Sequence, residues 1–201
     1  ITVGQTFNDG DQILETLTNA TNIIQQVSYT FEVEGNGCGP VGGFTTTVDV
    51  KPIPTMSITD ANDSFCEGGS TNITLNTPTQ NGVIRVTGVD YSGGNVTGGS
   101  ITIGQTFTDG QKITETLFTS TDNIETVTYT FEVDAGSCGP IGPYSESVTV
   151  RPTPAMSITN TAANICSGED AAITLNTPTE NGLIRVTAVN YGSVTGSTGI
   201  T

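Results

Sequence analysis

Hydrophobic and polar residues alternate along several short stretches of the chain. The clearest is residues 127–133, where Val127, Tyr129, Phe131 and Val133 are separated by Thr and Glu. A period of two is the pattern of a β-strand that buries one face. Shorter apolar pairs predict the other strands of residues 54–153, about seven in total: Ile73 with Leu75, Ile84 with Val86, Ile101 with Ile103, Ile113 with Leu117, and Val148 with Val150.

Turn signals separate these expected strands. Asn-Gly at 81–82 and Asp-Gly at 109–110 favour tight turns, and Cys-Gly-Pro at 138–140 marks a hairpin. No segment shows the 3.6-residue period of an amphipathic helix. The pattern therefore predicts an all-β protein with immunoglobulin-like β-sandwich domains.

The chain repeats itself at a spacing of 100 residues. ITVGQTFNDG at 1–10 returns as ITIGQTFTDG at 101–110. ITLNTPTQNGVIRVTGVDY at 73–91 returns as ITLNTPTENGLIRVTAVNY at 173–191. A period of this length indicates tandem domains of about 100 residues each.

Two proline pairs mark the expected limits of the repeats. VKPIPTM at 50–56 and VRPTPAM at 150–156 hold the only Pro-x-Pro pairs in the chain. Proline fixes φ and removes a ladder donor, so a strand does not easily continue through either pair. We therefore predict the C-terminal half of one repeat at 1–53, a complete repeat at 54–153 and the N-terminal half of the next repeat at 154–201.

A boundary at the Gly-rich VTGGS segment is the alternative, and it would give two domains, 1–100 and 101–201. The length fits either division, since 201 residues suffice for about two domains. The prolines favour the first division because they interrupt β-pairing. The chain is expected to be an interior piece of a longer protein, so the lack of a signal peptide carries no information about its location.

The charge balance excludes several partners and chemistries. The chain has 20 acidic and 5 basic residues, a net charge of −15, and no histidine. Nucleic acids and anionic membranes are bound through Lys/Arg patches, so neither is an expected partner. No apolar run approaches about 18 residues, so no membrane insertion is expected. Catalysis of the Ser-His-Asp or Cys-His type is excluded without histidine.

Four cysteines recur in register, as Cys38 and Cys138 and as Cys66 and Cys166. None forms a C-x-x-C pair and no histidine completes a zinc site, so disulfides and an oxidising, extracellular location are expected. In an immunoglobulin-like sandwich the chain start and the last hairpin share a pole, which predicts a bridge between Cys66 and Cys138. Cys38 and Cys166 are expected to pair outside this chain. Buried, unpaired cysteines are the alternative.

Carboxylates and tyrosines supply the remaining candidates. Glu15 and Glu115 recur in register, as do Glu32 and Glu132, but a catalytic pair in every copy of a repeat is unusual for an enzyme. A solvated strand face is the expected role of Glu32 and Glu132. Tyr91 and its copy in the next repeat could stack on sugars, and capping of the core is the expected alternative.

Calcium is the one metal for which hard oxygen ligands gather, at residues 8–11, 60–63 and 109–110. None of these segments has the ligand spacing of an EF-hand loop. The second copy replaces Asp11 by Gln111, so ordinary Asx turns are favoured. No cofactor is therefore expected, with calcium at one linker as the alternative.

The two copies share an ordered string of motifs. It runs from C-x-G at 66–68 and an x-D-G turn at 108–110 through Y-T-F-E-V and a C-G-P hairpin to V-x-V-[KR]-P-x-P. The string resembles the PKD-like repeats of giant surface adhesins of the Bacteroidota. It is similar in particular to the SprB-type gliding-motility adhesins, which the type IX secretion system exports. The resemblance covers essentially the whole chain, although GVIRVTGV at 82–89 stands where many copies carry a tryptophan.

The resemblance implies a PKD-like β-sandwich fold, display on the cell surface and a structural role in a filament. It implies surface adhesion in gliding motility and supplies no catalytic residues, so the chain is not expected to be an enzyme. The implied partners are neighbouring repeats of the same chain, a substratum or polysaccharide bound through the parent protein, and the motility and secretion machinery of the cell envelope.

A carbohydrate-binding or spacer module of a secreted multidomain hydrolase is the alternative function. Such a module would need an aromatic platform on one face. The chain has 5 Tyr, 7 Phe and no Trp, most of them needed for the cores, so the sequence supplies little material for one.

Overall fold

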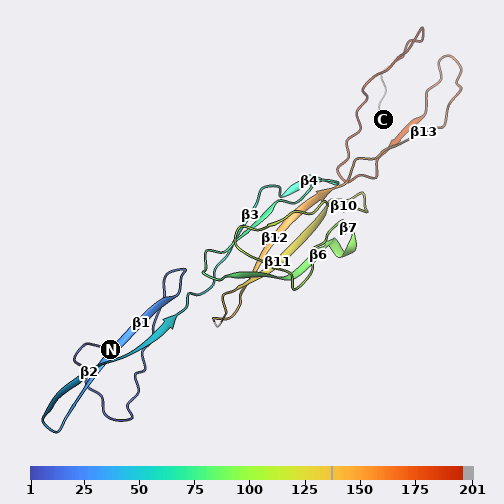
Figure 1. The fold of residues 1–201 in the computed structure, drawn as a ribbon. Coiled ribbons are helices and arrows are strands. Elements are labelled where there is room, and N and C mark those ends of the chain that lie inside the picture. Colours follow the sequence, from blue (N-terminus) through green and yellow to red (C-terminus); the bar gives the residue numbers. More distant parts are fainter. Residues whose placement is uncertain (137, 197–201) are drawn as a thin grey trace.

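The computed structural model describes residues 1–136 and 138–196 as three parts that follow one another along a line (Figure 1). The N-terminal part contains a long hairpin of two strands, β1 (Gln25–Gly35) and β2 (Cys38–Val50). The C-terminal part contains a pair of short strands, β13 (Ser157–Asn160) and β14 (Ile173–Asn176). All other elements lie in the central part.

The central part is built almost entirely from short strands. Apart from one 3-10 turn, η1, the described residues contain no helix. In chain order its elements are β3 (Ser57–Asp60), β4 (Ser64–Cys66), β5 (Ile73–Asn76), β6 (Val83–Tyr91), η1 (Ser92–Gly94), β7 (Val96–Thr97), β8 (Thr106–Phe107), β9 (Lys112–Ile113), β10 (Phe118–Thr119), β11 (Glu125–Asp134) and β12 (Ile141–Arg151).

Two main sheets form the central part. The larger has the strand order β4-β12-β11-β6-β8, and the smaller has the order β3-β5-β9. β12 pairs with β11 antiparallel, Val127 opposite Val148, but with β4 parallel. A further two-stranded sheet joins β7 to β10. The protein is thus all-β, and its central part has the sheets of a β-sandwich.

The core of this sandwich draws side chains from both main sheets. Residues of β11 and β12 that the alternating pattern assigned to one face are fully buried, as are the inward residues of β5 and β6. The fully buried side chains are mainly aliphatic and surround two aromatic rings, as in a normal β-sandwich core: Ile73, Leu75, Ile84, Val86, Ile113, Leu117, Val127, Tyr129, Phe131, Val133, Val148 and Val150.

One predicted strand is replaced by a turn. Ile101 is buried, but Ile103 is 68% exposed and neither residue lies in a strand. Gln105 donates its amide to the carbonyl of Thr102 at 3.1 Å, and Gly104 has a φ of 91°. The tight turn needs this left-handed glycine, and it turns Ile103 away from the core, so the prediction of an Ile101–Ile103 strand was wrong.

The cysteines are placed differently from the sequence prediction. All four are exposed free thiols, and no disulfide is present among the described residues. Cys66 pairs with Arg151 at the end of β12, whereas Cys138 precedes the start of that strand. β12 has 11 residues and spans about 33 Å, far beyond the roughly 7 Å Cα separation of a bridge. The parallel β4–β12 pairing therefore overturns the assumption that the two cysteines share a pole.

Candidate functional site: the junctions between repeats

Hydrogen bonds recur in the same pattern at the two junctions where one part of the chain meets the next. The first junction is the Pro-containing linker 51–56, in which Pro52, Pro54 and Met56 are buried while Ile53 stays exposed. Pro152 is buried in the second junction. Because proline holds φ near −65°, each linker is a stiff, extended connection.

Two threonines hold the end of the linker. The amide of Thr55 donates to Oγ1 of Thr79 at 3.0 Å, and Oγ1 of Thr77 donates to the carbonyl of Thr55 at 2.9 Å. Both side chains are buried. A Cβ at Gly82 would lie 2.5 Å from Oγ1 of Thr77, so the following turn needs glycine at this position.

The second junction repeats this arrangement. The amide of Ala155 donates to Oγ1 of Thr179 at 2.8 Å, and Oγ1 of Thr177 donates to the carbonyl of Ala155 at 2.7 Å. A Cβ at Gly182 would lie 2.7 Å from Oγ1 of Thr177. The bonds need only the backbone at position 155, which explains why alanine can stand where the first junction has threonine.

The next residue of this loop reaches across the junction. The amide of Gln80 donates to the carbonyl of Asn22 at 2.7 Å, and Oε1 of Gln80 accepts from the amide of Ile24 at 2.7 Å. Asn22 and Ile24 belong to the preceding part of the chain. The two bonds therefore fix the orientation of one part relative to the next.

Glu180 makes the same pair of bonds at the second junction. Its amide donates to the carbonyl of Asp122 at 2.8 Å, and its Oε2 accepts from the amide of Ile124 at 2.8 Å. The position needs one side-chain oxygen that accepts a bond, which glutamine and glutamate both offer. This pair of bonds, from Gln80 or from Glu180, is called the junction clamp below.

Glu67 adds a further hydrogen bond at the second junction. Its Oε1 accepts from the amide of Thr153 in the linker at 3.0 Å. Hydrogen bonds from the Thr153 side chain and amide lower the pKa of Glu67, so the carboxylate stays ionised and keeps accepting.

Within the central part, Glu115 is a buried carboxylate that holds a loop in place. It accepts bonds from the hydroxyl of Tyr129 at 2.6 Å and from the amide of Ile101 at 2.7 Å, and also from the amide of Ser100. The hydroxyl of Tyr91 donates to it at 3.0 Å. Burial, together with the Glu115 carboxylate, raises the pKa of both tyrosines well above the usual range.

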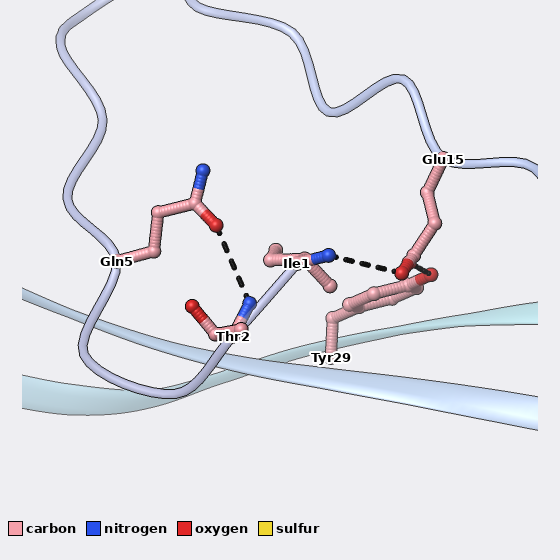
Figure 2. Close-up of polar contacts among 5 residues, drawn as sticks. All are labelled: Ile1, Thr2, Gln5, Glu15 and Tyr29. Carbon is pink, nitrogen blue, oxygen red and sulfur yellow. Dashed lines mark hydrogen bonds and ion pairs between the residues drawn. The ribbon is translucent and has the colours of Figure 1, made fainter.

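Figure 2 shows the same arrangement in the first copy. The hydroxyl of Tyr29 donates to Glu15 at 2.7 Å, and the amino group of Ile1 lies 3.0 Å from the same carboxylate. Ile1 occupies the place that Ile101 has in the second copy. The bond from Tyr29, followed by the bond from the Ile1 amino group, lowers the pKa of Glu15. The cluster occurs in both copies, and the hydrogen bonds that Glu15 and Glu115 accept all come from groups of the chain. This indicates that the two carboxylates have a structural role.

The other sequence candidates lie apart from any common site. Glu132 lies on the outer face of β11, 3.7 Å from the guanidinium of Arg85, while Glu32 is exposed on β1. Tyr91 is partly buried and packs edge to face on Tyr129, with ring centroids 6.3 Å apart. This position caps the core, as its strand-end location suggested.

Three of the carboxylates considered for calcium accept hydrogen bonds from backbone amides. Asp109 accepts from the amide of Thr77 at 2.7 Å, Asp11 from Asn8 at 2.7 Å, and Asp60 from Asn62 at 2.9 Å. Within 1–136 and 138–196, no three His, Cys, Asp or Glu residues come together in a way that could hold a metal ion.

Sequence reasoning missed the junction clamp, although its signal was present. Residues 73–79 return unchanged as 173–179, ITLNTPT in both copies. The first four residues of this segment are the strand β5, whose burial explains Ile73 and Leu75 but not the polar Thr-Pro-Thr that follows. Polar residues repeated unchanged after a strand were the available sign that the loop makes specific contacts.

No model of a known protein family matches the chain, and a search of curated proteins also found no match. Within residues 1–136 and 138–196, no helix is long and apolar enough to cross a membrane.

Proposed function

We propose that the chain is a non-enzymatic segment of a stiff shaft, in which β-sandwich repeats are joined end to end with a fixed relative orientation. The observation that carries the proposal is the junction clamp, which occurs twice with equivalent residues and nearly equal distances, at Gln80 and at Glu180. A flexible linker would need no such contacts, since adjacent domains then move independently.

The topology of the central part supports an immunoglobulin-like or PKD-like repeat. The order β4-β12-β11-β6-β8, with β4 parallel to β12 and β3-β5-β9 in the opposite sheet, matches a sandwich whose first strand switches between sheets. Core residues run from Met56 to Val150. These limits support a complete repeat at 54–153, with parts of its neighbours at 1–53 and 154–201.

We infer that this shaft is extracellular and belongs to a cell-surface adhesin of the gliding-motility type. The motif string that resembles SprB-type repeats supports this, and so does the acidic composition. A net charge of −15 opposes lateral clumping of neighbouring filaments. In this function the neighbouring repeats are the direct partners, and a substratum or polysaccharide is bound by the parent protein.

Pulsed electron paramagnetic resonance tests the fixed orientation. Spin labels on Cys38 and Cys138, with Cys66 and Cys166 replaced by serine, report the distance across the first junction. The wild-type junction should give one narrow distance distribution, and Gln80→Ala should broaden it. The matched control is Gln26→Ala, because that side chain bonds only to Asp49 of the same hairpin, at 3.0 Å. A broad distribution in the wild-type chain contradicts the stiff shaft.

A second experiment addresses the surface role. An antibody against this segment, coupled to beads, should bind live cells that carry the protein. Beads that travel along the cell body support gliding motility. Beads that bind and remain still leave a static stalk and remove the motility part of the proposal.

A further inference from the structure

The two cysteines of the complete repeat lie at opposite ends of its sandwich. Cys66 is the last residue of β4 and pairs with Arg151, and the amide of Glu67 donates to the carbonyl of Arg151 at 2.8 Å. Arg151 begins the linker to the following repeat. The β4 cysteine of the central repeat is therefore placed at its forward end.

The other cysteine belongs to the hairpin between β11 and β12, at the rear end. This hairpin lies beside the linker that enters the repeat, since a Cβ at Gly136 would be only 3.9 Å from Nζ of Lys51. Cys138 follows Gly136 by two residues and is exposed. The hairpin that carries Cys138 thus approaches the junction with the preceding repeat through Gly136.

Lys51 and Arg151 are the same position in successive copies. At the first junction, Lys51 lies beside the β11–β12 hairpin of the repeat that follows it. At the second junction, Arg151 lies beside Cys66, the β4 cysteine of the repeat that precedes it. Because the junction clamp holds both junctions in the same arrangement, the two views can be combined. In a continuous array, a β4 cysteine and a hairpin cysteine flank the same basic residue at every junction.

We propose that consecutive repeats are joined covalently by a disulfide between the β4 cysteine of one repeat and the hairpin cysteine of the next. The partner of Cys66 is then the cysteine one period beyond Cys138, and the partner of Cys138 lies one period before Cys66. Each repeat is linked forward through one cysteine and backward through the other. The proposal rests on the proposed function, because it requires repeats in a continuous array.

The bond forms by thiol–disulfide exchange with a small-molecule disulfide such as oxidised glutathione. One cysteine thiolate attacks the oxidant and releases one reduced glutathione, and the second cysteine displaces the other. Two thiols lose two protons and two electrons, and the oxidant gains them as two glutathione thiols. The bond would be a second covalent connection beside the peptide linker. It would hold the relative orientation of two repeats under tension, which the junction clamp otherwise holds by hydrogen bonds.

The test uses an array in which residues 1–150 of the chain are followed by residues 51–201. The new join keeps the natural Val-Lys sequence of positions 50–51 and gives two complete repeats in succession. After equilibration with reduced and oxidised glutathione, peptide mapping without reduction should find Cys66 of the first repeat linked to Cys138 of the second. The original 201-residue chain should keep its four thiols free of internal bonds under the same conditions.

Two matched variants of the array distinguish the possible pairings. Replacing Cys138 of the first repeat and Cys66 of the second by serine should leave the bond intact. Replacing Cys66 of the first repeat and Cys138 of the second should abolish it. A bond between Cys66 and Cys138 of one repeat, or only mixed disulfides with glutathione, overturns the proposal. A narrow spin-label distribution with no such bond would overturn the disulfide and leave the stiff shaft standing.

Discussion

The central repeat and the two terminal copies have similar sequences but very different surroundings. Leu75 is fully buried, whereas Leu175 at the same place in the next copy is 44% exposed. Val148 is fully buried, whereas Val48 is 44% exposed. β1–β2 and β13–β14 nevertheless keep the strand pairing of β11–β12 and β3–β5. Strand pairing is therefore local to each part, while the buried core cluster lies in the central part.

The largest difference in stability between the copies should appear when the equivalent leucine of each copy is replaced by alanine. Leu75→Ala removes a side chain from a closed core and should lower the free energy of unfolding of the central repeat by about 2–5 kcal/mol. Leu175→Ala acts on an exposed side chain and should change it by less than about 0.5 kcal/mol. Denaturant unfolding followed by circular dichroism measures both, and equal effects would show that the third copy has a core of its own.

Glu115 should matter more than Glu15 for a related reason. Glu115→Gln removes one acceptor oxygen from a buried cluster and leaves the hydroxyl of Tyr129 or Tyr91 competing for the one that remains. An unsatisfied buried donor costs about 1–3 kcal/mol, so the melting temperature of the central repeat should fall by several degrees.

Glu15→Gln is the matched control for this substitution. The cluster around Glu15 and Tyr29 is open to water, which can replace a lost hydrogen bond. The melting curve of the Glu15→Gln variant should overlay that of the wild-type chain. A loss as large as that of Glu115→Gln would mean that the first copy is as closed as the second.

The contrast between copies also shows what could be predicted from sequence. The strands β5, β6, β11 and β12 were predictable because apolar residues alternate along them and one sheet face excludes water. Ile103 was mispredicted because the same alternation occurs in a turn whose direction is set by Gly104. Short strands such as β8 and β10 have two residues each and carry no readable period.

The junctions were predictable only in part. The prolines were expected to interrupt β-pairing, and no strand includes residues 51–56. The clamp, however, depends on a side chain meeting backbone atoms 56 residues away, between Gln80 and Ile24. The repeated polar loop indicated that specific contacts exist there, but the backbone partners of those contacts leave no pattern in the sequence. The position of Cys66 was misjudged for a similar reason, because the direction in which β4 pairs with β12 is a tertiary property.

The smallest expected effect concerns Glu125, whose place in the first copy is taken by Gln25. Glu125 accepts bonds from the hydroxyls of Ser92 and Thr121 and from the side chain of Asn95, and these bonds, led by that of Ser92, lower its pKa. A lowered folded-state pKa adds stability above the unfolded value of about 4.3, and this stability is lost as the pH falls through the folded value.

Glu125→Gln should therefore cost about 1 kcal/mol at pH 7 and less at pH 3, because pH 3 lies below the unfolded-state pKa and part of the stability that the lowered folded-state pKa supplies is then lost. Thermal melts of both chains at these two pH values measure the difference. Glu34→Gln, at an exposed position of β1, should show no such convergence. Equal losses at pH 7 and pH 3 would mean that Glu125 stabilises the turn by shape alone, and that the glutamine of the first copy serves the same purpose without a charge.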